Sequence, residues 1–256
     1  MLYKVTNPDK VEHLFAGWEE TMIWSCLQNV MGCLYTNHRE NPMSVIAVLG
    51  DFAFFAGEVC EELISDFMTN NYEKDFMILV PQNEMWGGMI EKCYGNKCRK
   101  VIRYAFKKEA DIFDTKKLEK MVCGLQDEYR LVMIDERWFS YCKKIDWCKD
   151  FVAQYETFDI YDKNGLGVLV TKDDVPVSGA SSYSGYLNGI EIEIDTREDY
   201  RRKGLATICG ARLILECIKK KIYPSWDAQN LWSVALAEKL GYHFSHKYTA
   251  YEVYEK

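Results

Sequence analysis

Apolar and polar residues follow two different periods along this chain. Residues 44–49 and 76–80 are short apolar runs bounded by turn residues, which is typical of buried strands. Residues 7–28, 83–93 and 205–219 instead carry apolar side chains at the spacing of one helix face. Residues 189–196 alternate strictly, with isoleucines on one face and acidic residues on the other. Strands that alternate with helices predict an α/β layering rather than a β-sandwich.

The expected elements divide the chain into two domains. A helix over 114–125 is followed by a turn, and a new strand begins near residue 129. A chain of 256 residues is also long enough for two domains, each with a core of its own. We therefore expect an N-terminal domain of residues 1–125 and a C-terminal domain of residues 126–256.

Composition and charge narrow the classes of function. With 39 acidic and 32 basic residues, the net charge of −7 argues against a general affinity for nucleic acid or an anionic membrane. The 10 cysteines contain no C-x-x-C pair and there are only 4 histidines, so no metal site is expected and the thiols are interpreted as reduced, small apolar residues. Because no signal peptide and no apolar run near the ~20 residues of a membrane span is present, we expect a soluble, cytoplasmic protein.

One loop concentrates positive charge. The segment Arg201-Arg202-Lys203-Gly204 lies between the alternating strand and the helix that begins near Leu205. A helix start presents free backbone N–H groups and the positive end of the helix dipole, which together suit a phosphate group. Gly204 lets the backbone approach such a group closely. On these residues alone, a solvated basic turn is an equally good interpretation.

The context of the loop favours the phosphate site. The pattern Arg-x-x-Gly-x-Ala, after a strand and at the start of a helix, resembles the acyl-coenzyme A signature of the GNAT superfamily of N-acyltransferases. The Asn-led segment 230–242 resembles the fourth helix of that family, and the block 223–230 with the run 233–242 resembles a bacterial subgroup that includes the zwittermicin A resistance acetyltransferase. The resemblance implies an α/β (α+β) fold with a central mixed, mostly antiparallel sheet flanked by helices, and acetyl-CoA as the cosubstrate.

The same resemblance implies where coenzyme A binds. Backbone amides of the loop would hold the pyrophosphate, and the outer part of strand 193–196 would pair with the pantetheine arm. Asn230 would contact the arm from the opposite side, and Ser233 would line the cleft, so the strands must splay between 193–195 and 223–226. The implied cofactor-binding residues are Ile194, Thr196, Arg201, Arg202, Lys203, Gly204, Leu205, Ala206, Asn230 and Ser233.

Acyl transfer to an amine also needs a base and an acid. The amine must lose a proton, so a carboxylate beside the strand is a sensible general base. Glu193 and Glu191 are the candidates, with Glu193 slightly preferred because it is nearer the loop, although each is equally well interpreted as a solvent-facing strand residue. Many family members place a tyrosine in the fourth helix as the acid, and Ala237 occupies that position here. The tyrosines that could take over this role, or simply pack, are Tyr242, Tyr248 and Tyr251.

The first half of the chain resembles a degenerate repeat of the second. A constant shift in residue number places Gly57 on Gly204 and Asn83 on Asn230, and a series of strand, helix, strand, helix and strand falls in matching places. Apolar Phe54-Phe55-Ala56 stands where the basic residues stand, so this copy is expected to lack a phosphate site. We therefore expect residues 1–125 to be a degenerate GNAT-like repeat with a structural or substrate-shaping role.

These observations predict an acyl-CoA-dependent N-acyltransferase that transfers acetyl from acetyl-CoA to a primary amine of a small molecule, such as an antibiotic. The alternative is a non-catalytic coenzyme A-binding regulatory module, which the missing helix tyrosine favours. A third class, a macromolecular binding protein that uses the tyrosine-rich end, lacks a charged or aromatic platform. Neither nucleic acid nor a membrane is an expected partner, and monomer and homodimer both stay open.

Overall fold

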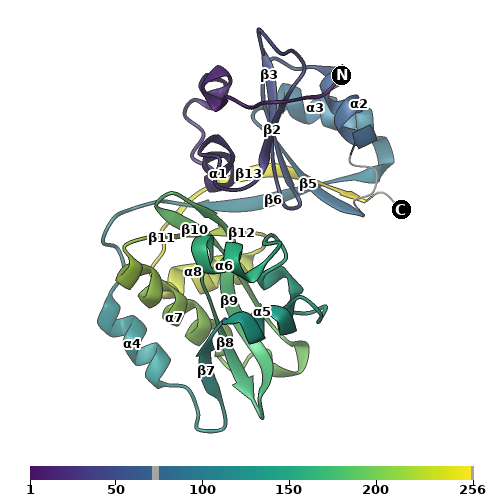
Figure 1. Cartoon of the computed structure of the whole chain (residues 1–256). Helices are drawn as coiled ribbons and strands as arrows, with labels where there is room; N and C mark the ends of the chain where they lie inside the picture. Colours follow the sequence, from purple (N-terminus) through teal and green to yellow (C-terminus); the bar gives the residue numbers. More distant parts are fainter. Residues whose placement is uncertain (71–74, 255–256) are drawn as a thin grey trace. The chain divides into compact units, whose positions relative to one another are not determined.

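The computed structural model describes residues 1–70 and 75–254, and the chain divides into two compact units (Figure 1). The first contains Met1–Arg103 and Lys247–Lys256, and the second contains Tyr104–His246. The boundary expected at residue 125 therefore falls inside the second unit. Helix α4 (Thr115–Cys123) explains the difference, because its Leu118 is fully buried in the core that α7 (Leu205–Lys220) also fills. The last strand, expected in the C-terminal domain, ends in the first unit.

A mixed sheet organises the first unit. In spatial order its strands are β1 (Tyr3–Lys4), β2 (Cys33–Thr36), β3 (Ser44–Leu49), β4 (Phe52–Gly57), β5 (Phe76–Pro81), β13 (Phe244–Tyr254) and β6 (Cys98–Phe106). Neighbours from β1 to β4 are antiparallel, β4 and β5 are parallel, and β5 and β13 are antiparallel. The helices are α1 (Thr21–Leu27), α2 (Glu61–Asn70) and α3 (Glu84–Tyr94), with short 3-10 turns at Pro8–Lys10, Glu12–Phe15 and Gly95–Lys97.

Two expectations for the first unit need correction. The single helix expected over 7–28 is wrong: two 3-10 turns precede α1, and Gly17 between them and α1 has a φ of 76°, which no right-handed helix accommodates. Strand β4 was not expected, since its residues are apolar on both faces and show no alternation. The expected order of strand, helix, strand, helix and strand over 44–106 is present, with β4 added between the first strand, β3, and the first helix, α2.

A five-stranded mixed sheet organises the second unit. Its spatial order is β11 (Tyr223–Ser225), β10 (Gly189–Thr196), β9 (Val175–Tyr186), β8 (Gly167–Lys172) and β7 (Arg130–Met133). Every neighbouring pair is antiparallel except β10 and β11, which are parallel. Strand β12 (Asp227–Ala228) pairs instead with the end of β6, at Tyr104 and Ala105. The expected mixed, mostly antiparallel sheet is confirmed.

Helices cover both faces of the second sheet (Figure 1). Helix α7 packs on β8, β9 and β10 and contacts both α4 and α8 (Leu231–Leu240). Helices α5 (Glu136–Cys142) and α6 (Phe158–Asn164) and the 3-10 turn Lys149–Phe151 lie on the other side, in place of the single helical stretch expected over 137–154. Over the described residues, no helix has the length and apolar character that a membrane crossing requires.

The alternation of isoleucine and acidic residues along β10 determines which side chains face α7. Ile190 and Ile192 belong to the core shared with α7 and α8, and Ile194 packs against it. Because side chains alternate along a strand, the acidic residues Glu193 and Asp195 point to the opposite face. The strand thus presents isoleucines on the α7 face and acidic side chains on the other, as its sequence predicts.

Candidate functional site

The loop before α7 has the backbone geometry of an anion-binding turn. After the 3-10 turn Glu198–Tyr200, two of its residues are left-handed, Arg202 with a φ of 62° and Gly204 with a φ of 79°. Gly204 is the N-cap of α7, and no side chain caps the helix there. Open space surrounds Gly204, since a Cβ built on it would meet no atom within 4 Å. The first backbone N–H groups of a sixteen-residue helix are therefore directed into an exposed loop.

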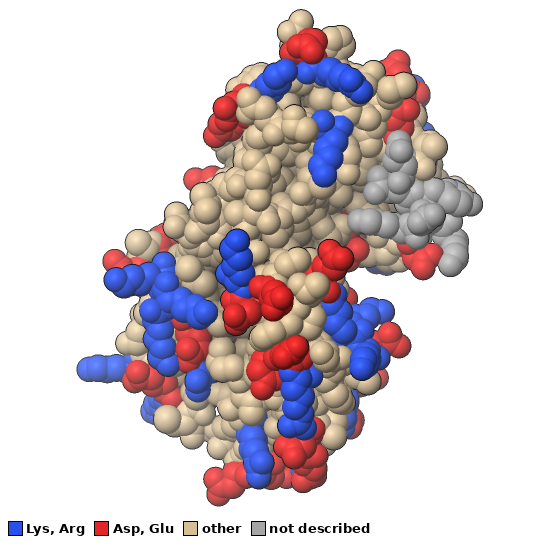
Figure 2. Space-filling model, in the orientation of Figure 1, with Lys and Arg blue, Asp and Glu red and all other residues tan. Residues whose placement is uncertain are grey.

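The cationic side chains of the loop differ in their contacts. Arg201 Nε donates to the carbonyl oxygen of Thr196 at 3.2 Å, which ties the loop to the end of β10. The ammonium of Lys203 lies 4.5 Å from the ring centroid of Tyr200, and Arg202 is exposed. Figure 2 shows Lys and Arg interspersed with Asp and Glu on the visible face of the second unit. A local cationic loop therefore coexists with the net charge of −7.

Strands β10 and β11 diverge to form a fork. The ladder between them ends where Glu191 pairs with Ser225, whereas β10 continues beside β9 as far as Thr196. The outer part of β10, from Ile192 to Thr196, thus runs from the inner end of the fork toward the cationic loop. This is the splay that the sequence analysis requires for an extended ligand to lie beside the strand.

Helix α8 closes the other side of the fork with a polar N-terminus. The Asn230 carboxamide oxygen accepts from the backbone N–H of Ser233 at 3.0 Å, so Asn230 is the N-cap of α8 and its amide nitrogen can still donate. The Ser233 hydroxyl accepts from Trp226 Nε1 at 3.1 Å. This contact positions Trp226 and leaves the Ser233 hydroxyl able to donate, so its cleft-lining role stays a prediction.

The two candidate bases differ in environment. Glu191 is only 6% exposed and lies at the inner end of the fork, while Glu193 is half-buried along its outer part. Asp195, which sequence reasoning did not select, is also half-buried; desolvation raises the pKa of its carboxyl above the ordinary value, partly offset by the backbone N–H of Thr196 at 2.6 Å. The structure places three carboxylates along one strand beside the fork, which suits a cationic or amine ligand.

Two of the three tyrosines considered as replacement acids already donate their hydroxyl protons to other groups. Tyr242 is almost fully buried, and its hydroxyl donates to the carbonyl oxygen of Pro224 at 2.7 Å. Burial raises the pKa of Tyr242 well above its ordinary value. Tyr248 and Tyr251 belong to the first unit, where the Tyr251 hydroxyl donates to Glu91 at 2.8 Å. Ala237 is fully buried, so α8 supplies no acid at that position.

Sequence reasoning also missed a hydroxyl pair at the fork. The hydroxyls of Tyr186, at the end of β9, and Ser225, at the end of β11, lie 2.9 Å apart. The phenol reaches Ser225 by crossing β10 at Gly189, where an added Cβ would lie 2.3 Å from the Tyr186 oxygen. The absence of a side chain at Gly189 is the one sequence signal that could have indicated this approach.

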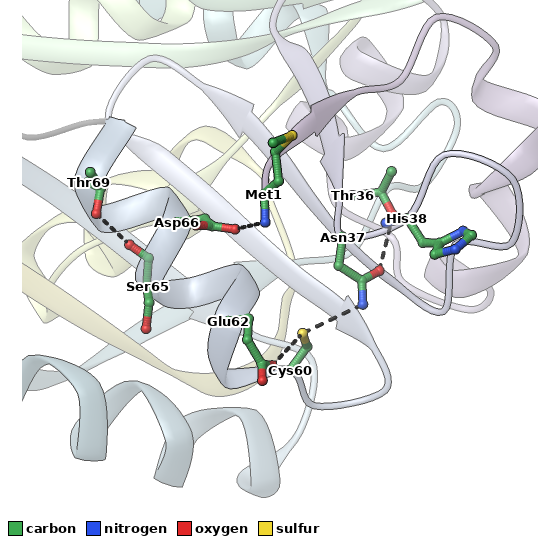
Figure 3. Close-up of polar contacts among 9 residues, drawn as sticks. All are labelled: Met1, Thr36, Asn37, His38, Cys60, Glu62, Ser65, Asp66 and Thr69. Atoms are coloured by element: carbon green, nitrogen blue, oxygen red, sulfur yellow. Dashed lines mark hydrogen bonds and ion pairs between the residues drawn. The ribbon is translucent and has the colours of Figure 1, made fainter.

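The corresponding place in the first unit is closed. Gly57 has a φ of 83°, close to that of Gly204, but a Cβ there would lie 2.2 Å from the carbonyl oxygen of Met43. Its N–H donates to Gln82 Oε1 at 3.1 Å. Before α2, the Cys60 thiol accepts from Asn37 Nδ2 at 3.5 Å and donates to Glu62 Oε2 at 3.4 Å, as Figure 3 shows. Packing and internal hydrogen bonds occupy the space that stays open before α7.

Comparisons with known proteins agree with this arrangement. The GNAT acetyltransferase family model matches residues 12–251. A GCN5-related N-acetyltransferase-like protein from Streptococcus suis is 42% identical, with a TM-score of 0.91 over 96% of this chain and 98% of that chain. The protein YdfB of Bacillus subtilis, named an uncharacterized N-acetyltransferase, is 28% identical over 90% of this chain and 89% of its own.

A more distant likeness concerns the fold alone. A tandem GNAT protein from the clavulanic acid biosynthesis pathway is 9% identical, with a TM-score of 0.57 over 100% of this chain and 98% of that chain. The family match extends over both compact units. The chain belongs to the GNAT acetyltransferase family and is an N-acetyltransferase.

Proposed function

We propose that this protein transfers acetyl from acetyl-CoA to a primary amine of a small molecule by direct attack of the amine on the thioester. The observation that carries the proposal is the uncapped start of α7, with left-handed Gly204 in open space, next to the open side of β10. Loop amides and the Arg201–Lys203 cations suit the pyrophosphate. Residues 192–196 offer a strand edge to the pantetheine arm.

The acceptor proposed here is a cationic amine. Glu191, Glu193 and Asp195 put acidic groups on one face of β10, and a carboxylate there can take the proton that the amine must lose before attack. Because the 223–230 block resembles the zwittermicin A resistance subgroup, amine antibiotics belong in the first set of acceptors. We also propose a cytoplasmic setting, in which the ten cysteines, all free thiols in the structure, stay reduced.

The first half is proposed to be a degenerate copy of the catalytic half. The strand order β1-β2-β3-β4-β5 has the same sequence of antiparallel and parallel pairs as β7-β8-β9-β10-β11. Asn83 caps α3 through Trp86 N–H as Asn230 caps α8 through Ser233 N–H. The closed surroundings of Gly57 support a structural role for this half.

Release of coenzyme A from acetyl-CoA tests the proposal. The protein is incubated with acetyl-CoA and a panel of aminoglycosides, polyamines and amino sugars, and free coenzyme A is separated by chromatography, because five of the protein's own thiols are at least partly exposed. We expect release that depends on one amine class. Binding of acetyl-CoA without turnover on any amine of the panel would contradict the proposed acceptor class.

A further inference from the structure

We propose that the Ser225 hydroxyl, held by Tyr186, donates the proton that the departing thiolate takes. The proposal rests on the proposed function and supplies the acid that α8 lacks. Ser225 is the last residue of β11 to pair with β10, so it lies at the inner end of the fork, opposite Glu191. A pantetheine arm that follows β10 from the cationic loop brings its sulfur end to this point.

The geometry around Ser225 is that of a supported donor. Ser225 is 1% exposed, and its Oγ lies 2.9 Å from the Tyr186 hydroxyl. Paired residues of neighbouring strands share a face, so Ser225 lies on the same face of the sheet as Glu191. Gly189 leaves the space that the Tyr186 ring crosses. The pairing of β9, β10 and β11 therefore brings the Tyr186 phenol to the Ser225 hydroxyl.

Burial, more than nearby charge, raises the pKa of the phenol in this pair. Burial raises the pKa of Tyr186, with the Glu191 carboxylate adding to the effect and the Ser225 hydrogen bond opposing it. Burial likewise raises the pKa of Tyr223, which also interacts with Glu191. The titratable groups packed about Ser225 thus favour neutral phenols near pH 7, and a neutral phenol can donate.

The protons balance over one cycle. As the amine nitrogen bonds to the thioester carbon, the carbon–sulfur bond breaks and its electron pair stays on sulfur. The proton lost by the amine goes to a carboxylate of β10 and then to solvent. Sulfur takes the Ser225 proton, Ser225 takes the Tyr186 proton, and the half-buried phenol regains one from solvent.

Three variants test this assignment with acetyl-CoA and butylamine as the probe pair. Ser225→Ala is expected to lower kcat about 100-fold without changing the KM for acetyl-CoA, because general acid catalysis contributes on this scale. Tyr186→Phe is expected to lower kcat in the wild-type background and to have no further effect in Ser225→Ala, since the phenol acts only through the serine. Ser184→Ala is the matched control: Ser184 pairs with Glu191 from β9, and its buried hydroxyl has no hydrogen-bond partner among the described residues.

A second readout needs no acceptor amine. The thiol of bound coenzyme A is titrated by the ultraviolet absorbance of its thiolate, against a complex with desulfo-coenzyme A. A serine that donates to the thiolate lowers the thiol pKa, so Ser225→Ala is expected to raise it by about one unit or more. An unchanged thiol pKa, or equal kcat values in Ser225→Ala and Ser184→Ala, would overturn the assignment. Failure of wild-type protein to bind coenzyme A would instead refute the proposed function.

Discussion

At the scale of single residues, the site is defined by where each carboxylate lies along β10. Glu191 is buried at the inner end of the fork, opposite Ser225, and Glu193 lies two residues toward the cationic loop. The sequence gives a slight preference to Glu193 because of its distance along the chain from the loop. Because Glu191 lies beside the last paired residue of β11, we propose Glu191 rather than Glu193 as the general base.

Glu191→Gln is therefore expected to lower kcat by 10²–10⁴-fold, the range for a lost general base, whereas Glu193→Gln lowers it less than about tenfold. Both changes keep side-chain size, so the thermal midpoints should stay close to that of the wild type. Steady-state kinetics with acetyl-CoA and an accepted amine distinguish the two residues. A larger loss in Glu193→Gln would restore the preference drawn from the sequence.

At the scale of elements, the N-caps of two helices allow an effect on stability to be distinguished from an effect on acetyl-CoA binding. Asn230 caps α8 beside the fork, and Asn83 caps α3 in the first unit with the same hydrogen-bond pattern. Loss of an N-cap asparagine costs roughly 1 kcal/mol of unfolding free energy. Asn230→Ala and Asn83→Ala should therefore lose similar stability in urea unfolding.

The two variants should differ in affinity for acetyl-CoA. Asn230→Ala is expected to weaken binding by about tenfold, because the amide nitrogen of Asn230 no longer donates to the pantetheine arm. Asn83→Ala should bind like the wild type. Equal affinities in the two variants, measured by calorimetry, would remove Asn230 from the site.

Elements differ in how far the sequence predicts them. Strand β10 matches the expected residues 189–196 because its two faces carry side chains of opposite polarity, which appear in the sequence as strict alternation. The expected helix over 7–28 failed because Gly17 takes a left-handed conformation that apolar spacing does not reveal. Strand β4 was missed because burial on both faces removes the alternation.

The residues of the site also differ in how far the sequence predicts them. The cationic loop and Gly204 are contiguous in sequence, so a local motif predicts them, and the splay of β10 from β11 follows from the family resemblance. The Tyr186–Ser225 pair joins β9 to β11 across β10, and only the paired strands bring its two hydroxyls together. Asp195 was visible on the acidic face of β10, but its desolvation depends on the packed fold.

At the scale of the whole molecule, two units share a pattern of strands, and the loop before the helix that follows the fourth of these strands differs between them. Gly204 and Gly57 have nearly the same φ, but open space surrounds the first and backbone atoms crowd the second. Apolar Phe54 and Phe55 are fully buried before Gly57, while Arg201 and Arg202 are exposed before Gly204. The chain is therefore expected to bind one acetyl-CoA, in the second unit.

Calorimetric titration of acetyl-CoA into wild-type protein, Gly204→Asp and Gly17→Asp tests this claim most directly. Gly17 is the matched control, since its φ of 76° and open surroundings reproduce the backbone cost of the substitution outside the loop. We expect one site per chain in wild type and Gly17→Asp, and no detectable binding in folded Gly204→Asp, because its carboxylate faces the pyrophosphate. Unchanged affinity in Gly204→Asp, or two sites per chain in the wild type, would contradict the account.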